Sequence, residues 1–308
     1  MPTIKLAVIP VAGLGTRLLP STKSQPKEML PVAKKPVVQY VVEEMEANGI
    51  DQILLVTGKN KTSIENHFDF DHELTRKLRE NGKEDLLPEL EYERMRLQFF
   101  FTRQRKQKGL GDAVLCAQKF TKNDPFAVAL GDSIIGLHGR SMLLRNMCRI
   151  FEEENPSCVI AVQEVTPDRV SSYGIVEPAS DGELFRISDM VEKPDPADAP
   201  SNLAVSARYV FSPEIYDAIE HTYAGKGGEV QLTDAIRLLI REGRKVMGVK
   251  LPSGDNRYDI GNFGAYYKAF IEFAMDDPDF GEEVRAFIKE KVVENSKEAR
   301  LRENRALR

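Results

Sequence analysis

The sequence predicts an α/β protein in which a Rossmann-like, mixed and mostly parallel sheet is flanked by helices and followed by a C-terminal helical extension. Short apolar, β-rich runs alternate with helical patterns through the first half of the chain. β-rich runs return in the second half, and no Gly/Ser linker separates the two parts. The last segment, residues 276–308, has the pattern of a highly charged helix.

The first half predicts βαβ units, which build parallel sheets. An amphipathic helix is expected over residues 36–48, with Pro36 in its first turn and Gly49 at its C-terminal end. The polar stretch between Thr57 and Leu97 predicts helices outside the sheet, as an excursion at its edge. The remaining elements expected here are strands over 5–9, 52–58, 97–104 and 126–132 and a helix over 111–120.

The second half begins with a helix expected over residues 140–154. Because no linker follows, one domain is expected over 1–275, and the segment 276–308 is either a solvated helix or a dimer contact. The other expected elements are strands over 158–165, 173–178, 184–194, 203–211 and 245–251, helices over 212–223 and 230–243, and an aromatic-rich segment over 257–275.

Composition restricts the class of ligand. The chain of 308 residues has 43 Lys and Arg against 48 Asp and Glu, and the net charge of -5 argues against broad affinity for nucleic acid. Neither a membrane-spanning run nor a signal peptide is present, so a soluble, cytoplasmic protein without a membrane partner is expected. Three cysteines (Cys116, Cys148, Cys158) and four histidines lack metal-type spacing, which argues against disulfides and zinc. A small ligand is expected.

The loop after the first strand predicts a phosphate site. Gly13 and Gly15 match the first two glycines of the dinucleotide-binding pattern GxGxxG, but Leu18 occupies the position of the third. The Gly-Lys-Ser/Thr sequence that ends a Walker A loop is also missing here. Arg17 can present its planar, charged fork to phosphate oxygens, and Lys27 in "QPKEMLP" supplies a second cation. The alternative for the loop alone is a tight turn with an exposed arginine.

The stretch "AGLGTRLLP" followed by "PKEMLP" resembles the signature of the sugar nucleotidyltransferases, which join a nucleoside triphosphate to a sugar 1-phosphate. Further stretches match in order: "QYVVEEMEANGI", "ENHFD", "RQRKQKGLGDAVLCA", "YGIV", "VEKP", "PSNLAVSARYVF" and "QLTDAI". The likeness covers residues 4 to about 290 and is strongest to members that use UTP and glucose 1-phosphate. It implies the nucleotide-diphospho-sugar transferase fold, with a nucleotide-binding half over about 1–135 and a sugar-binding half over about 136–275.

A glutamine amide suits uracil, whose edge offers an N–H beside carbonyl oxygens. The resemblance places Gln104 at the base, and the alternative for Gln104 is an exposed loop amide. The resemblance also places Gly109 and Gly111 at the base, and the alternative for these glycines is a turn that leads into a helix. Glu28 resembles a nucleotide-site residue, with an exposed carboxylate as the alternative. The nucleotide-binding residues implied are Ala12, Gly13, Gly15, Glu28, Gln104, Gly109 and Gly111.

Asp132 ends an apolar strand at the carboxyl edge of the expected sheet, where ligands of open α/β folds collect. Mg²⁺ is the expected cofactor because it takes one or two carboxylates together with substrate phosphates. The resemblance adds Asp259 in "RYDIGN" as a second metal ligand. A helix N-cap is the alternative for Asp132, and a structural turn carboxylate is the alternative for Asp259.

The sugar site rests on "VEKP" and "YGIV". The resemblance implies that Glu192 accepts hydrogen bonds from glucose hydroxyls and that Lys193 binds phosphate, while a surface ion pair is the alternative. Gly174 would let the backbone approach the sugar, and Asn202 is a further candidate. An ordinary turn glycine and turn asparagine are the alternatives for these two.

The reactants need neither a general base nor a covalent nucleophile, because the attacking phosphate oxygen is already anionic. Catalysis is therefore assigned to charge neutralisation and positioning by Arg17, Lys27, Asp132 and Lys193. UDP-glucose and pyrophosphate are the expected products, and a homodimer or homotetramer is expected. The rivals are the same reaction with dTTP, a nucleotide-sugar-binding protein without turnover, and an NAD oxidoreductase, which Leu18 disfavours.

Overall fold

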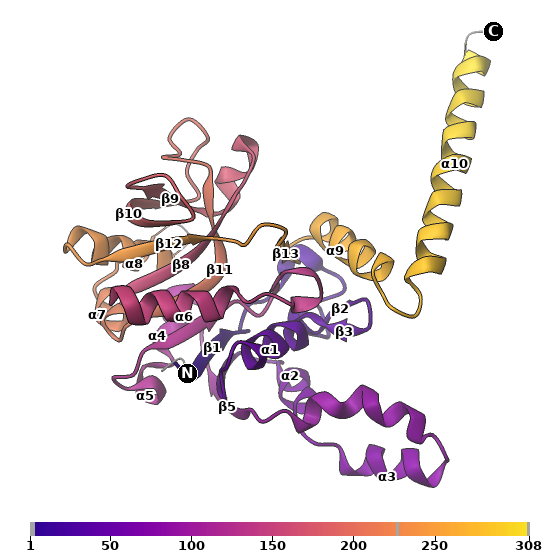
Figure 1. The fold of residues 1–308 in the computed structure, drawn as a ribbon, viewed down its shortest axis with the longest axis horizontal. Coiled ribbons are helices and arrows are strands. Elements are labelled where there is room, and N and C mark those ends of the chain that lie inside the picture. Colours follow the sequence, from indigo (N-terminus) through magenta and orange to yellow (C-terminus); the bar gives the residue numbers. More distant parts are fainter. Residues whose placement is uncertain (1–3, 226–227, 307–308) are drawn as a thin grey trace.

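The computed structural model describes residues 4–225 and 228–306. Its largest sheet has nine strands in the order β5-β4-β1-β6-β11-β8-β12-β10-β9 (Figure 1). The bounds of these strands are β1 (Leu6–Pro10), β4 (Gln52–Thr57), β5 (Gln98–Arg103), β6 (Phe126–Ala129), β8 (Cys158–Glu164), β9 (Gly174–Pro178), β10 (Leu184–Glu192), β11 (Leu203–Phe211) and β12 (Val246–Lys250).

The sheet changes character where the two halves of the chain meet. Strands β5, β4, β1 and β6 form one parallel ladder, as the βαβ order predicts. Strand β11 then joins β6 in antiparallel fashion and pairs with β8, so the sheet continues without a break into the second half. The carboxyl ends of the parallel strands share one edge, which is where ligands of such folds bind.

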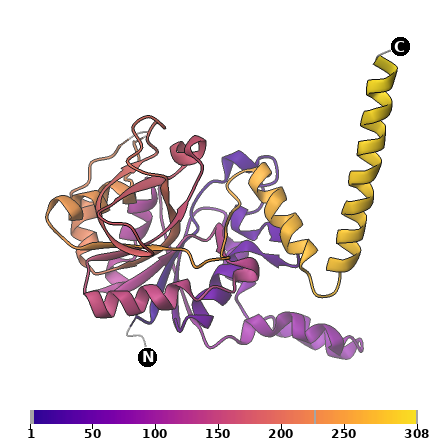
Figure 2. The ribbon, with the colours of Figure 1, turned by 45° about the horizontal axis from the view of Figure 1, so that its top comes forward.

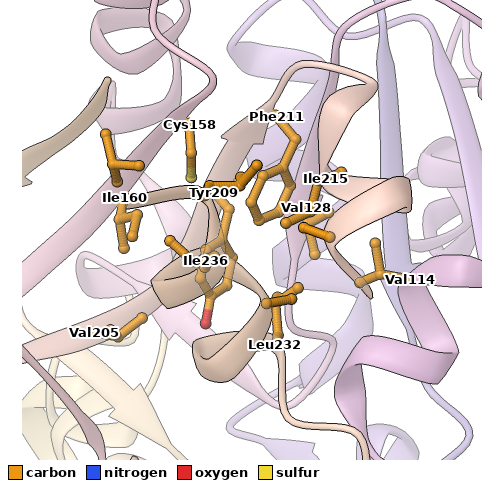
Figure 3. Close-up of a cluster of buried hydrophobic side chains, with 14 of the residues drawn as sticks. Val114, Val128, Cys158, Ile160, Val205, Tyr209, Phe211, Ile215, Leu232 and Ile236 are labelled. Carbon is orange, nitrogen blue, oxygen red and sulfur yellow. The ribbon is translucent and has the colours of Figure 1, made fainter. Parts of the chain in front are cut away.

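Helices cover both faces of this sheet, because successive strand residues point to opposite sides. Val8 packs with α4 (Leu110–Leu115), α7 (Glu214–Glu220) and α8 (Leu232–Arg241) on one face. Ile9 packs with α1 (Val37–Ala47), α2 (Thr62–His67) and α6 (Leu143–Glu154) on the other. Figure 3 shows the first cluster, in which Tyr209 and Phe211 of β11 meet Ile215, Leu232 and Ile236.

Helix α1 confirms the expected amphipathic segment with one shift. Pro36 belongs to the short strand β3 (Lys35–Pro36) and precedes the helix rather than lying in its first turn. Gly49 follows the C-cap with a φ of 96°, a value that glycine adopts without strain. The buried side of α1 is mostly apolar, yet it also carries Glu44, whose partner is described below.

The polar stretch between β4 and β5 is helical, as predicted. It holds α2, α3 (His72–Glu80) and η3 (Glu84–Arg94). His67 at the end of α2 stacks on Tyr92 of η3. Helix α3 and segment η3 pack on each other and extend away from the sheet (Figures 1 and 2). Phe68 of this stretch stacks on Phe99 of edge strand β5, whereas Phe101 on the same strand is 40% exposed, so the stretch covers part of the edge strand.

Smaller elements complete the fold. Strand β7 (Ser133–Ile135) pairs with β13 (Arg257–Asp259), and β2 (Pro31–Val32) pairs with β3. Helix α9 (Phe263–Met275) packs on the body, whereas the long helix α10 (Gly281–Ala306) projects from it (Figure 2). The remaining helical segments are η1 (Thr16–Leu18), η2 (Lys27–Met29), α5 (Gln118–Thr121), η4 (Leu137–Gly139) and η5 (Pro167–Ser172). Within residues 4–225 and 228–306, every helix is too short or too polar to cross a membrane.

Candidate active site

A cavity of about 420 Å³ opens at the carboxyl edge of the parallel ladder. It lies between the loop after β1, segment η2 and the start of α4. The predicted residues that line it are Ala12, Gly13, Gly15, Lys27, Glu28, Gln104, Gly109 and Asp132. The structure therefore brings most of the predicted nucleotide and catalytic residues into one place.

The loop after β1 is folded close to Lys27. Gly15 has a φ of 66°, and its carbonyl accepts a hydrogen bond of 2.7 Å from Thr22 Oγ1. A Cβ at Gly15 would lie 3.3 Å from Cβ of Lys27, so a side chain there would combine backbone strain with tight contact. Arg17 is exposed in η1 and lies outside the residues that line the cavity.

Lys27 and Asp132 form an ion pair across the cavity. Lys27 Nζ lies 2.5 Å from Asp132 Oδ2, and both side chains are about four-fifths buried. Asp132 raises the pKa of Lys27 above its usual value. Burial acts to raise the pKa of Asp132, but the Lys27 ammonium and Arg257 outweigh it, and the net shift is downward. Both groups are therefore charged at neutral pH.

Glu28 is buried rather than exposed, which rules out the exposed-carboxylate alternative. Its Oε2 accepts a 2.7 Å hydrogen bond from Lys61 Nζ, and Lys61 is itself buried. Burial raises the pKa of Glu28, and Lys61 and Lys27 oppose that effect. Because Glu28 follows Lys27 directly, the pair anchors η2 and the lysine that it carries.

The two aspartates expected at the metal lie side by side. In the β7–β13 pairing Asp259 stands opposite Ser133, the neighbour of Asp132, and the Ile260 N–H donates to the Asp132 carbonyl at 3.2 Å. Asp259 also receives hydrogen bonds from Arg257 at 3.3 Å and from the Gly261 N–H at 2.9 Å. Asp132 raises the pKa of Lys27 most, and Asp259 adds a smaller upward effect. Asp132 lines the cavity, whereas Asp259 does not.

This arrangement fits Mg²⁺. The Lys27 ammonium on Asp132 shows that this carboxylate holds a positive charge here. In the described ranges no group of three or more His, Cys, Asp and Glu side chains is placed to bind a metal. Two carboxylates without a complete protein cage are what Mg²⁺ uses when substrate phosphates and water supply its other oxygen ligands.

A buried ion pair supports the strand turn that carries Asp132. Arg208 of β11 binds the carboxylate of Glu44 through Nε at 3.0 Å and Nη2 at 2.6 Å, and both side chains are fully buried. Arg208 Nη2 also donates to the Ser133 carbonyl at 2.9 Å, and Nη1 donates to the Ala207 carbonyl at 2.9 Å. The guanidinium thus ties α1 and β11 to the residue after Asp132.

Gln104 follows β5 and is 4% exposed. Its Nε2 donates to the Gly109 carbonyl at 3.1 Å and to Asp112 Oδ2 at 2.7 Å. The exposed-amide alternative is therefore wrong. The donor side of the amide is occupied by the protein, which departs from the expectation that this amide both donates to and accepts from a base.

Gly109 and Gly111 allow a second loop to approach. A Cβ on Gly109 would lie 2.6 Å from the Val230 carbonyl oxygen, and one on Gly111 would lie 2.9 Å from the same atom. The Gly111 N–H donates to that oxygen at 2.9 Å. Gly111 thus packs against Val230 and does not line the cavity, whereas Gly109 does both.

Three of the predicted sugar residues, Gly174, Glu192 and Lys193, lie together at the start of β9, the end of β10 and the start of α8. Glu192 accepts hydrogen bonds from Lys193 Nζ at 2.5 Å and from Thr233 Oγ1 at 2.6 Å. A Cβ on Gly174 would lie 2.9 Å from Thr233 Oγ1, so glycine is needed where the backbone passes Thr233. Asn202 is exposed before β11, and its carbonyl accepts from the Val165 N–H.

A model of the nucleotidyl transferase family matches residues 6–275 of the chain. The chain belongs to the nucleotidyl transferase family. Among curated members of this family, the UTP–glucose-1-phosphate uridylyltransferase of Staphylococcus epidermidis is 44% identical over 291 residues, which span 94% of this chain and 99% of that protein.

Solved structures of the nucleotidyl transferase family extend this likeness to the fold. A UTP-bound UDP-glucose pyrophosphorylase from Acinetobacter baumannii is 37% identical with a TM-score of 0.84, covering 94% of this chain and 99% of that one. A UDP-glucose pyrophosphorylase complexed with UDP-glucose is 35% identical with a TM-score of 0.80, and the match covers 89% of this chain and 100% of that one. The nucleotide-diphospho-sugar transferase fold expected from the sequence is confirmed.

Several residues of this nucleotidyl transferase site were not predicted. Gln107 and Glu229 line the cavity, Lys61 neutralises Glu28, and Asp112 fixes Gln104. Gln107 and Asp112 lie within the matched stretch "RQRKQKGLGDAVLCA", so inspection of that stretch residue by residue could have found them. Lys61 carries no local signal, because its role depends on a pairing across 33 positions.

Proposed function

We propose that the chain is a UTP:glucose-1-phosphate uridylyltransferase that produces UDP-glucose and pyrophosphate. The single observation that carries this proposal is the cavity that joins Gln104, Lys27 and Asp132, because it offers a base contact and charged groups for a triphosphate in one space. The relatives named above support the choice of UTP and glucose 1-phosphate.

The reaction joins two anions. A phosphate oxygen of glucose 1-phosphate attacks the α-phosphorus of UTP in line, and a new P–O bond forms. The bond from the α-phosphorus to the bridging oxygen breaks, and pyrophosphate leaves with the bonding electron pair. No proton transfer is needed, so the site must supply orientation and positive charge.

Lys27 and Asp132 are assigned the central roles. In the structure each neutralises the other at 2.5 Å. A bound triphosphate offers Lys27 a stronger anionic partner, so the ammonium turns to the phosphates and frees the carboxylate. Arg17, which follows the loop after β1, is assigned to bind phosphate oxygens through two hydrogen bonds from its guanidinium. Glu28 and Lys61 hold η2 in place throughout.

Mg²⁺ is the proposed cofactor, and Asp132 and Asp259 are the residues that would hold it. When bound, the ion neutralises the charge that develops on the phosphate oxygens during transfer. Arg257 orients Asp259 through its 3.3 Å contact, and Arg208 supports the turn behind Asp132. These contacts restrain the Asp259 side chain and the backbone next to Asp132.

The sugar half is assigned to Glu192, Lys193, Gly174 and Asn202. Glu192 accepts hydrogen bonds from glucose hydroxyls, and Thr233 keeps one of its oxygens fixed at 2.6 Å. Lys193 releases Glu192 and moves to the phosphate of glucose 1-phosphate. The absence of a side chain at Gly174 leaves room for Thr233 and Glu192, so it supports the sugar site through these two residues.

We further propose a cytoplasmic homo-oligomer, a homodimer or homotetramer. Helix α10 has 26 residues and is about 39 Å long at 1.5 Å per residue. Phe280, Phe287 and Val292 near its start are each more than half exposed, as is Tyr267 on α9. A second copy of the chain would cover these apolar side chains. The thiols of Cys116, Cys148 and Cys158 are free, which suits a reducing compartment.

Pyrophosphate release tests the proposed reaction. The purified chain is given UTP, dTTP, CTP or ATP with glucose 1-phosphate, with and without Mg²⁺, and the nucleotide-sugar product is identified. We expect release with UTP, glucose 1-phosphate and Mg²⁺ together. A preference for dTTP would assign the chain to the thymidylyl branch, and binding without release would make it a nucleotide-sugar-binding protein.

A further inference from the structure

Asp112 controls the orientation of the Gln104 amide. The amide nitrogen of Gln104 lies 3.1 Å from the Gly109 carbonyl and 2.7 Å from Asp112 Oδ2. A backbone carbonyl and an ionised carboxylate can only accept hydrogen bonds. If the amide turned over, its oxygen would face two acceptors, so only the observed orientation is stable.

This orientation decides what Gln104 can offer a base. Gln104 lines the cavity, is 4% exposed, and has its nitrogen turned toward α4. The atom left for a ligand is Oε1, an acceptor. Uracil carries a donor at N3, and cytosine carries an acceptor at the same position. A buried acceptor facing another acceptor leaves both without a partner, which is costly.

We propose that Asp112 is a specificity-determining residue that selects uridine over cytidine nucleotides by locking the Gln104 amide. The inference rests on the proposed function, because it assumes that the base lies against Gln104. Asp112 is not among the site residues that the sequence predicts. Thymine also carries an N–H at N3, so the lock separates uracil from cytosine and does not separate uracil from thymine.

The distinguishing variant is Asp112→Asn, which keeps the shape and adds a donor. The new amide can donate to Gln104 Oε1 in the turned orientation, which leaves the Gly109 carbonyl as the one acceptor that opposes the turn. A larger share of the Gln104 amides can then present an N–H to cytosine. Sites built to bind a substrate N–H reject analogues lacking it by about 10⁴-fold. We expect the wild-type preference for UTP over CTP, as the ratio of kcat/KM values, to fall at least about tenfold in this variant.

A double-mutant cycle keeps the proposal falsifiable. Gln104→Leu removes the amide, and Asp112→Asn in that background should leave the UTP to CTP ratio unchanged, because Asp112 acts through Gln104. Glu229→Gln is the matched control. It removes one carboxylate charge from the cavity lining, where Glu229 Oε2 accepts from Gln231 Nε2 at 3.2 Å and not from Gln104, and it should leave the ratio unchanged.

Dissociation constants of UTP and CTP, measured by calorimetry, supply a readout apart from turnover. Asp112→Ala removes the carboxylate that accepts from the Gln104 amide and adds no donor. It should reduce the difference between the two dissociation constants by less than Asp112→Asn does. A wild-type UTP to CTP ratio in a folded Asp112→Asn variant that still makes UDP-glucose would overturn the lock and leave the proposed function intact. Failure of the wild-type chain to make UDP-glucose would instead overturn the function.

Discussion

Replacing Arg208 by Met should destabilise the protein strongly, because it strands a carboxylate in the core. Glu44 and Arg208 are both fully buried, and they share two hydrogen bonds of 3.0 and 2.6 Å. Removing one partner of a buried ion pair costs about 3 to 5 kcal/mol. Whole domains are stable by about 5 to 15 kcal/mol, so Arg208→Met should fold with a reduced margin.

The loss should grow with pH. Burial raises the pKa of Glu44 even in the native chain, where Arg208 opposes the shift. Without Arg208 the folded-state pKa rises further, while the unfolded value stays near about 4.3. A carboxyl group whose folded pKa is raised contributes stability below the unfolded pKa and loses it as pH rises toward the folded pKa. The deficit of Arg208→Met should therefore be larger at pH 8 than at pH 5.

Urea unfolding at pH 5 and pH 8 measures this effect. The double variant Arg208→Met/Glu44→Leu should recover most of the lost free energy and lose the added pH dependence, since apolar replacements of a buried pair are often neutral. Arg149→Met, at an exposed pair with Glu153, should cost less than about 1 kcal/mol. Equal losses at both pH values, or a double variant as unstable as the single one, would refute the reasoning.

Four further outcomes are expected. Asp132→Asn should lower kcat about 10²- to 10³-fold with little rescue by excess Mg²⁺, whereas full activity at limiting Mg²⁺ would contradict the metal assignment. Gln104→Ala should weaken UTP binding by about 1 to 3 kcal/mol in calorimetry, and unchanged affinity would remove it from the site. Glu192→Gln should raise KM for glucose 1-phosphate more than KM for UTP, while equal increases would indicate general damage. Deletion of residues after Asp277 should shift sedimentation toward the monomer and leave UTP binding intact, and unchanged sedimentation would place the subunit contact elsewhere.

The fold was largely predictable because its signals are local. Alternating apolar runs and helical periodicity are properties of consecutive residues, and they indicated the parallel strands and helix α1 within a few positions. The path of the excursion between β4 and β5 was not predictable. Helices α3 and η3 pack on each other away from the sheet, and nothing in their charged sequence states which partner each one takes.

The sequence predicted site residues only where they belong to a recognisable motif. Lys27 and Asp132 were proposed separately, and the structure shows that they pair across 105 positions of sequence. Glu44 and Arg208 are 164 positions apart, and each belongs to an element that the sequence predicts as part of the core, so their pairing was not predicted. Buried charges of this kind depend on tertiary pairing, so residue-by-residue inspection of a helix or strand cannot assign their partner.

The proposed reaction joins UTP, bound in the cavity that holds Lys27 and Asp132, to glucose 1-phosphate, bound at Glu192 and Lys193. The most direct measurement is the formation of UDP-glucose and pyrophosphate by the purified chain, followed for both products at once with Mg²⁺ present. We expect equal amounts of the two products, dependent on both substrates and on Mg²⁺. Binding of UTP and glucose 1-phosphate without any pyrophosphate release would contradict it.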